Sequence, residues 1–217
     1  MHILLTDVLR CPRCGPRFGL ILLADLVEER RVVSGRLGCP NCREAYPVAG
    51  GEPDLRVPGG EPLPAAEPLP ADLREAAVRT AALLGLAEAR GSVLLVGAGA
   101  ELAEELASLL PEVEVVAGAG APVGGAAPTA VNRVAGSRPL PFADASFRGV
   151  ALFGASAAGL AEEGARVLAA PGRLLVEGAP AGTAALLAGV GLRVLLEQES
   201  IVVGERGGGV RHPRGEA

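Results

Sequence analysis

Four cysteines, arranged as two Cys-x-x-Cys pairs, constrain the fold of this chain more than any other feature. The pairs are Cys11 with Cys14 and Cys39 with Cys42. A two-residue gap lets both thiolates of a pair turn toward one ion, and two pairs supply the four sulfur ligands that tetrahedral Zn²⁺ prefers. The sequence therefore predicts one structural zinc site. Because such a site has no open coordination position, it holds the chain together and does not act as a Lewis acid.

Three other readings of the cysteines compete with zinc: two disulfides, an iron site like that of rubredoxin, and four unrelated thiols. Disulfides are the weakest of these. Residues 1–9 lack the basic start, long apolar segment and small-residue cleavage site of a secretory signal. We therefore expect a reducing, cytoplasmic location, in which thiols stay available for metal.

The composition is that of a globular protein with no membrane segment. The chain has 217 residues, of which 49% are apolar, enough for one domain of ordinary size and a small one. The longest uncharged stretch, residues 115–132, is interrupted by glycine and proline and is unsuited to a spanning helix. The net charge is −5, and neither half of the chain is strongly basic, so a nucleic acid is not favoured as a direct partner.

Between the cysteine pairs, residues 19–26 and 30–37 have the apolar character of two short strands joined by a charged turn, which predicts a ribbon beneath the metal. Several arginines lie close in sequence to the ligands. We interpret them as charge compensation for four thiolates around one Zn²⁺, with a binding face as the alternative. They are Arg10, Arg13, Arg17, Arg36 and Arg43.

The second cysteine pair is followed by Tyr46-Pro47-Val48 and, shortly after, by Gly51-Glu52-Pro53. With the paired cysteines, these motifs resemble a small bacterial zinc-ribbon family related to the activating subunit of eukaryotic tRNA and protein methyltransferases. The resemblance covers residues 1–57 and departs from the family at Glu52, where an apolar residue is usual. In that family the ribbon is a partner that stabilises or activates a methyltransferase, which implies a protein partner here.

A proline-rich linker over residues 58–71 separates this ribbon from a second domain, expected at 72–206 and followed by a tail at 207–217. Buried apolar strands alternate with helices in the second domain, which predicts an α/β fold with a mostly parallel sheet covered on both faces. We expect helices at 72–90, 101–110 and 157–169. We expect strands at 92–96, 113–116, 131–134, 147–153 and 173–177, then an antiparallel hairpin at 192–197 and 200–206.

Four motifs in order, at 97–100, 140–147, 165–176 and the closing hairpin, resemble the class I S-adenosylmethionine-dependent methyltransferase fold, a Rossmann-like architecture. The resemblance covers residues 72–206. It implies a cofactor site that begins with an acid and three alternating glycines. This chain offers Leu95 at the acidic position, Gly97 and Gly99 for two glycines, and either Glu101 or a one-residue deletion at the third. Glu101 also places a carboxylate at a helix N-terminus, where it satisfies the dipole that attracts anionic ligand groups.

The remaining cofactor positions implied by the resemblance have also lost their acids. The strand that ends within 115–120 carries no carboxylate for the ribose hydroxyls, and Ser137 stands where an adenine-side aspartate is expected. Losing one charged hydrogen bond costs roughly 1.5–3 kcal/mol, so two or three losses can turn micromolar affinity into millimolar. The segment 154–159 has one hydroxyl and no acid, base or amide, so no catalytic group is expected there.

The sequence thus leads to a preferred hypothesis and two alternatives. The preferred hypothesis is a zinc ribbon fused to a degenerate methyltransferase-like domain that has lost S-adenosylmethionine binding and acts as an accessory, adaptor or assembly subunit. The first alternative is an active methyltransferase whose missing contacts come from backbone groups or a partner chain, because a fold does not determine an activity. The second is a zinc ribbon that binds nucleic acid.

Overall fold

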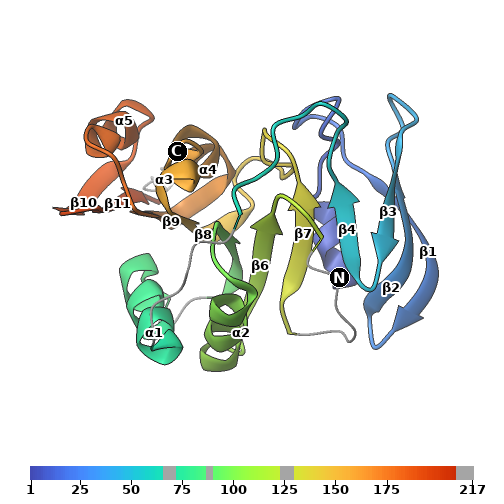
Figure 1. The fold of residues 1–217 in the computed structure, drawn as a ribbon, viewed down its shortest axis with the longest axis horizontal. Helices are drawn as coiled ribbons and strands as arrows, with labels where there is room; N and C mark the ends of the chain where they lie inside the picture. Colours follow the sequence, from blue (N-terminus) through green and yellow to red (C-terminus); the bar gives the residue numbers. More distant parts are fainter. Residues whose placement is uncertain (66–71, 87–89, 123–129, 209–217) are drawn as a thin grey trace, which may run out of the picture.

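The computed structural model describes residues 1–65, 72–86, 90–122 and 130–208, which are built around one sheet (Figure 1). Among these residues the sheet has 11 strands in the order β1-β2-β3-β4-β7-β6-β5-β8-β9-β11-β10. Its first four strands form the ribbon and pair antiparallel, the central strands are parallel, and the last two add an antiparallel hairpin. The predicted mixed α/β class with a mostly parallel centre is confirmed.

The ribbon consists of a short 3-10 helix and four strands, and it includes both cysteine pairs. Two of its strands lie within two residues of the predicted positions, and the two after the second cysteine pair were not expected. The elements are η1 (Ile3–Asp7), β1 (Ile21–Glu28), β2 (Arg31–Gly38), β3 (Ala45–Ala49) and β4 (Glu52–Leu55).

The last ribbon strand joins the ribbon to the rest of the sheet. β4 runs parallel to β7 (Asn132–Gly136), with Asp54 opposite Ala135 and Leu55 opposite Gly136. A backbone ladder therefore continues across the boundary that the sequence places at residue 57. The ribbon is therefore attached to the larger sheet by the backbone hydrogen bonds of β4 as well as by the linker.

The parallel strands of the second half follow from short apolar runs that are buried on both faces. They are β5 (Gly91–Val96), β6 (Val113–Ala119), β7, β8 (Phe147–Phe153) and β9 (Leu168–Glu177). The hairpin of β10 (Arg193–Gln198) and β11 (Ile201–Arg206) pairs with β9 through β11, as predicted.

Helices cover both faces of this sheet (Figure 1): α1 (Leu73–Leu84) and α2 (Ala100–Leu109) on one face, and α3 (Ala155–Ala158), α4 (Ala161–Val167) and α5 (Thr183–Gly189) on the other. Two helix predictions need correction. α1 ends at Leu84 and not near Arg90, because Gly85 takes a left-handed conformation (φ 67°) that caps the helix. The helix predicted over 157–169 is instead the two short helices α3 and α4. α5 was not predicted.

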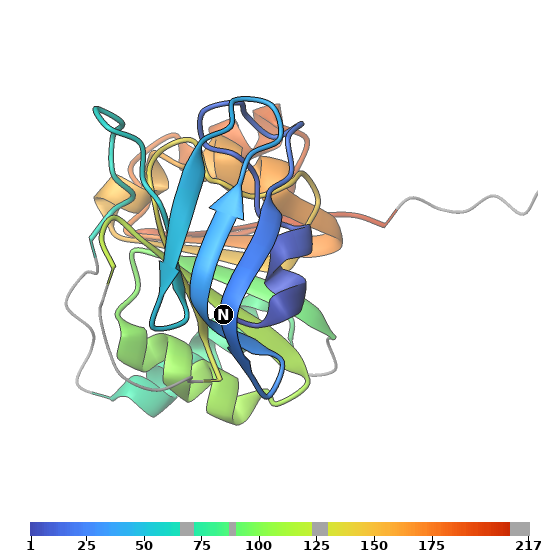
Figure 2. The same cartoon turned by 90° about the vertical axis from the view of Figure 1, so that its right-hand side faces the viewer.

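The ribbon also packs against one face of the sheet, on the side of α3–α5 (Figure 2). Leu5 and Leu9 are buried in one core with Phe142, which follows β7. Two backbone hydrogen bonds join the same segments: Arg10 N–H donates to the Pro141 carbonyl (2.9 Å), and Ala143 N–H donates to the Val8 carbonyl (2.8 Å). The ribbon and the second half therefore share both a sheet and a hydrophobic core.

Candidate functional site

The four cysteine sulfurs lie in the arrangement that a single Zn²⁺ requires. All four Sγ atoms are within 4.8 Å of one another. The Cys11 and Cys42 sulfurs are 3.7 Å apart, and those of Cys14 and Cys39 are 3.8 Å apart. Sulfur atoms placed about 2.3 Å from one ion at the corners of a tetrahedron are separated by about 3.8 Å. The donor set thus fits zinc, and Cys11, Cys14, Cys39 and Cys42 form the candidate metal centre.

The two knuckles have the same backbone design. Each closes with a hydrogen bond back to its first cysteine, from Gly15 N–H to the Cys11 carbonyl (2.9 Å) and from Arg43 N–H to the Cys39 carbonyl (3.0 Å). Gly15 (φ 84°) and Arg43 (φ 64°) both lie in the left-handed region, and each directly follows the second cysteine of its pair. This shared turn points both thiolates of a pair the same way. The two-residue spacing therefore directs both thiolates of a pair toward one position, as the sequence predicts.

Tyr46 supports the metal centre through its contact with the Cys11 sulfur. Its hydroxyl lies 3.5 Å from the Cys11 sulfur, and its side chain is buried. Burial raises the pKa of Tyr46 well above its usual value, and the neighbouring Cys11 adds to this, so the hydroxyl stays protonated and donates. Burial also raises the pKa of Cys11, but the hydrogen bond from Tyr46 and those from the backbone outweigh it and lower that pKa to about 7. The only tyrosine of the chain thus stabilises a thiolate ligand.

The arginines near the cysteines do not form one cluster around the metal centre. Arg13 pairs with Glu44, and Arg10 donates to the carbonyls of Asp7 and Leu9 (both 2.9 Å). The pKa of Arg13 is raised first by Glu44 and also by the charge of Cys42. The other three predicted arginines, Arg17, Arg36 and Arg43, are exposed. Of the five, Arg13 therefore carries the clearest compensating role.

The second candidate site is the edge of the sheet where the parallel strands end. Gly97 directly follows β5, Gly99 is the N-cap of α2, and Glu101 is exposed in the first turn of that helix. Ser137 directly follows β7. These residues share one edge, but β6 lies between the two groups, so two strand spacings, about 10 Å, separate them.

The backbone around Gly97 explains why glycine stands there. Its φ is 78°, and a Cβ at this position would lie 2.3 Å from the carbonyl oxygen of Phe153 on β8. Glycine is therefore needed for the close approach of two neighbouring strands, whether or not a ligand binds beside it.

A short segment of the linker, residues 60–65, crosses the ends of β6 and β7; we refer to it as the strap. The Leu63 side chain is 2% exposed, and its Cδ1 would contact a Cβ at either Gly118 or Gly136. Leu63 N–H donates to the Gly136 carbonyl (3.1 Å), and Pro62 bridges to Ser137. The strap thus lies against the strand ends where the methyltransferase resemblance expects the ribose and adenine contacts.

Polar groups fasten the strap to the same edge. Arg138 N–H donates to the Glu61 carbonyl (2.7 Å), and the Arg138 Nε lies 3.1 Å from a carboxylate oxygen of Glu61. The Arg138 guanidinium also donates to the carbonyl of Ser156 (2.9 Å). The Ser137 hydroxyl is buried and accepts a hydrogen bond from Val57 N–H (3.3 Å). Ser137 is therefore bonded to the last residue before the linker, a role that its sequence context does not indicate.

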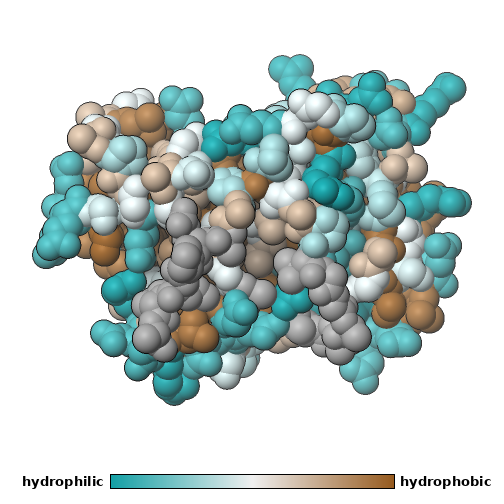
Figure 3. Space-filling model, viewed as in Figure 1, coloured by the Kyte–Doolittle hydropathy of each residue, from teal (hydrophilic) through white to brown (hydrophobic). Residues whose placement is uncertain are grey.

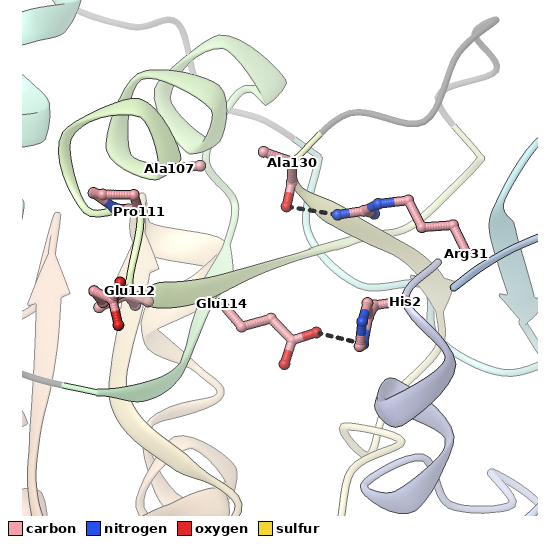
Figure 4. A pocket seen from close by; sticks show the side chains of 8 residues that line it. His2, Arg31, Ala107, Pro111, Glu112, Glu114 and Ala130 are labelled. Carbon is pink, nitrogen blue, oxygen red and sulfur yellow. Dashed lines mark hydrogen bonds and ion pairs between the residues drawn. The ribbon is translucent and has the colours of Figure 1, made fainter. Parts of the chain in front are cut away.

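A pocket of about 460 Å³ lies at the opposite edge, where β6 and β7 begin (Figure 4). Two residues that line it are joined by the buried Asn132, which accepts from His2 N–H (2.6 Å) and donates to Glu114 (2.8 Å). Arg31 reaches across to the carbonyl of Ala130 (3.3 Å). No sequence motif signals this network, which ties the start of the ribbon to the sheet and is satisfied by its own members.

These features define a zinc ribbon built into the sheet of an α/β fold whose central strands are parallel. Residues 2–51 match the family described as Trm112p-like protein, and the amino-terminal module is a zinc ribbon of this kind, as its motifs predict. Among curated proteins, no sequence matches the chain. In the part of the chain that the structure describes, no helix has the length and apolar character needed to cross a membrane.

Several solved structures similar to this chain are methyltransferases. An O-methyltransferase family protein from Burkholderia thailandensis has 12% identity and a TM-score of 0.42, over 63% of this chain and 56% of that one, so the chain spans little more than half of its length. A precorrin-6y methyltransferase from Geobacter metallireducens has 16% identity and a TM-score of 0.47, over 66% of this chain and 94% of its own. A Burkholderia thailandensis 1,6-didemethyltoxoflavin-N1-methyltransferase with bound S-adenosylhomocysteine has 17% identity and a TM-score of 0.44, over 63% and 79%.

Proposed function

We propose that this methyltransferase-related protein no longer binds S-adenosylmethionine and acts as an accessory, adaptor or assembly subunit for a protein partner. The zinc ribbon and the α/β fold define the scaffold. The loss of the cofactor and the accessory role are the proposal.

The position of the strap carries this proposal. In the methyltransferase resemblance, the ends of β6 and β7 hold the ribose and adenine of the cofactor. Here Leu63 packs on Gly118 and Gly136, and its carbonyl oxygen lies close above Gly120. A nucleoside placed at these strand ends would have to displace a buried leucine and break the Leu63 to Gly136 hydrogen bond.

The side chains at this edge do not compensate for the steric obstacle. Residues 117–122, at the end of β6 and just beyond it, are alanine, glycine and proline, so they offer no carboxylate to ribose hydroxyls. Leu95, in the expected acidic position of β5, is 1% exposed within the core. The Ser137 hydroxyl is already bonded to the backbone of Val57. The residues present therefore do not fit the cofactor.

The segment after β8 offers no catalytic group either. Its one hydroxyl belongs to Ser156, which is exposed on α3, and the carbonyl of that residue is held by Arg138. A transferase needs a group that positions or deprotonates the acceptor atom. Residues 154–159 contain no acid, base or amide for this task.

The ribbon supports an accessory role in a specific way. In the family that it resembles, a ribbon binds and stabilises a methyltransferase. Here the edge strand β4 pairs with β7 of the same chain, so the ribbon already stabilises a methyltransferase-type domain. A further partner must therefore bind at a surface other than the β4 edge.

Isothermal titration calorimetry of the zinc-loaded chain with S-adenosylmethionine and S-adenosylhomocysteine tests the proposal. We expect no binding heat and no thermal shift up to millimolar ligand, because the strap and the missing acids act together. Dissociation in the low micromolar range would defeat the proposal and favour an active methyltransferase. Transfer of a radiolabelled methyl group to any fraction of a native cell extract would do the same.

The strap itself provides a matched variant for the same titration. Leu63→Ala removes the side chain that covers Gly118 and Gly136 but leaves the strap backbone in place. If the strap is an obstacle in addition to the missing acids, we expect this variant to bind S-adenosylmethionine with a dissociation constant no lower than millimolar. Micromolar binding by the variant alone would instead identify the strap as a removable lid over an intact site.

A further inference from the structure

The strand at the ribbon end of the sheet, β1, exposes an unusual amount of apolar surface. Of the nine large apolar side chains exposed in the described residues, four lie on this strand. They are Ile21 (56% exposed), Leu23 (50%), Leu26 (46%) and Val27 (45%). Hydrophobic residues are visible on this side of the molecule, at the right of Figure 3. Exposed apolar residues scattered singly need no explanation, but four on one strand mark an interaction site.

β1 also has an open edge, because β2 is its only neighbour in the sheet of the described residues. The first half of the strand is regular: Ile21 to Ala24 pair one by one with Gly38 to Gly35. The register is irregular from Asp25 onward, and such bulges end regular pairing. Proteins usually protect an edge with charge, proline or a bulge. The segment Ile21 to Ala24 has none of these and can accept another strand.

We propose that two copies of this chain associate through these edges, with residues 20–24 of one copy antiparallel to the same residues of the other. Centred on Leu22, this register places Ile21 opposite Leu23 of the second copy, and Leu23 opposite its Ile21. Ile21 and Leu23 lie on the same face, because side chains alternate along a strand. The pairing therefore joins four exposed side chains into one cluster and uses a single surface twice. This inference goes beyond the proposed function and does not depend on it.

The charges beside the edge complement one another in this arrangement. Asp25 is exposed just beyond the paired segment, and none of the ion pairs among the described residues includes it. The Arg10 guanidinium lies 3.7 Å from the Cβ position of Gly19, just before the other end of the segment, and it donates to the backbone carbonyls of Asp7 and Leu9. An antiparallel partner brings Asp25 of each copy toward Arg10 of the other. Both ends of the pairing then gain an attractive contact.

The other exposed charge on this face does not oppose the association. Arg36 lies opposite Leu23 on β2, one strand in from the edge. In the proposed pair, three strand spacings, about 14 Å, separate the two Arg36 backbones. This exceeds the screening length of about 8 Å at physiological ionic strength, so their repulsion is largely screened.

Sedimentation velocity of the zinc-loaded full chain, over a range of concentrations, tests the proposal. We expect a concentration-dependent dimer. Leu23→Arg should raise the dissociation constant at least tenfold, because it places a charge in the apolar cluster. Val78→Arg is the matched control: Val78 is 51% exposed on α1, far along the sheet from β1, and the dimer should be unchanged. A wild-type chain that remains monomeric at high micromolar concentration overturns the proposal, as does a dimer that Leu23→Arg leaves intact.

A charge exchange tests the antiparallel register. Asp25→Arg alone should weaken the dimer by about tenfold, and adding Arg10→Asp should restore at least part of the affinity. Zinc content and circular dichroism confirm that each variant is folded. If Asp25→Arg has no effect, the register is wrong. If the chain is monomeric and this surface instead binds a different protein, the edge has another occupant and the dimer is excluded.

Discussion

The carbonyl oxygen of Leu63 lies so close above Gly120 that a Cβ on this glycine would come within 2.2 Å of it. The Cβ would also meet the Pro62 side chain at 3.1 Å. Both contacts are with the strap, and the first is with backbone, which cannot rotate aside as a side chain can. Gly120 is therefore required by the fit of the strap on the end of β6.

Gly120→Ala should consequently push the strap away from the sheet. Overpacking a well-filled site typically costs about 1–3 kcal/mol, and we expect a loss of unfolding free energy in this range. Urea denaturation measures it, and limited proteolysis should show faster cleavage near residues 60–65. Gly189→Ala serves as the control, because a Cβ at Gly189 meets nothing within 4 Å. Equal stability of Gly120→Ala and the wild type would mean that the strap is not closely packed.

Arg166 provides a second test, because its guanidinium is bonded to several groups of the loop between β7 and β8. It donates to the carbonyls of Leu140 (2.9 Å) and Phe142 (2.8 Å) and pairs with Glu163 and Asp144. A lysine cannot reproduce this fork of donors. We expect Arg166→Lys to lower the unfolding free energy by about 2–3 kcal/mol, because buried carbonyls lose their donors.

The control for Arg166 is an arginine with a simpler environment. Arg79 makes one hydrogen bond, to Glu177 (3.0 Å), and its side chain is 44% exposed. Arg79→Lys should change the unfolding free energy by no more than about 0.5 kcal/mol, since exposed ion pairs contribute little. Similar losses for both variants in urea denaturation would show that Arg166 is only a surface ion pair.

The features that the sequence predicted well are local ones. The cysteine spacing determines the knuckles, because the turn that follows each pair involves only neighbouring residues. The apolar runs at β5 and β8 determined those strands, since no helix of that length and character would be stable there. One helix end was misplaced because the prediction extended the helix to residue 90, whereas Gly85 takes a left-handed conformation and caps α1.

The features that the sequence could not reveal depend on contacts between distant segments. Asp54 pairs opposite Ala135, and Leu63 packs on Gly136, yet neither partner carries a signal for the other in its own neighbourhood. A linker rich in proline and glycine resembles a flexible spacer, and the burial of Leu63 becomes visible only when the sheet edge is assembled. The cofactor positions remain predictions, because the fold places them at one edge of the sheet but does not show whether a ligand binds there. They are Gly97, Gly99, Glu101 and Ser137.

The shared sheet and core lead to a third prediction, on the separated halves. Residues 58–217 alone should be poorly soluble or unfolded, because they lose β4 from the edge of β7 and lose Leu5 and Leu9 from the core around Phe142. Coexpression with residues 1–57 should recover a soluble complex, which size-exclusion chromatography would detect. A fragment 58–217 that unfolds cooperatively, at the same denaturant concentration as the full chain, would show that the halves are energetically independent.

The fourth prediction concerns the hydrogen bond from Tyr46 to the Cys11 sulfur. Tyr46→Phe removes the hydroxyl and leaves the buried ring in place. Groups that orient metal ligands typically contribute a factor of 10–100 to metal affinity, and we expect a loss of about tenfold here. Competition with a chromophoric chelator at neutral pH measures the zinc affinity. Because structural zinc contributes on the order of 10 kcal/mol to folding, complete removal by a strong chelator should unfold the ribbon and expose β4 and β7.

Asn41 offers the control for Tyr46, because it donates to a different thiolate ligand, Cys14, from an exposed position. Its Nδ2 lies 3.2 Å from the Cys14 sulfur. After Asn41→Ala, water can replace the lost donor, because the position is exposed. After Tyr46→Phe, the space beside Cys11 is closed to water. The Asn41 variant should therefore lose less than threefold in zinc affinity. Equal losses of zinc affinity in the two variants would show that burial of the Tyr46 hydroxyl does not increase its contribution to zinc binding. An unchanged affinity in a folded Tyr46→Phe protein would show that Cys11 needs no supporting donor.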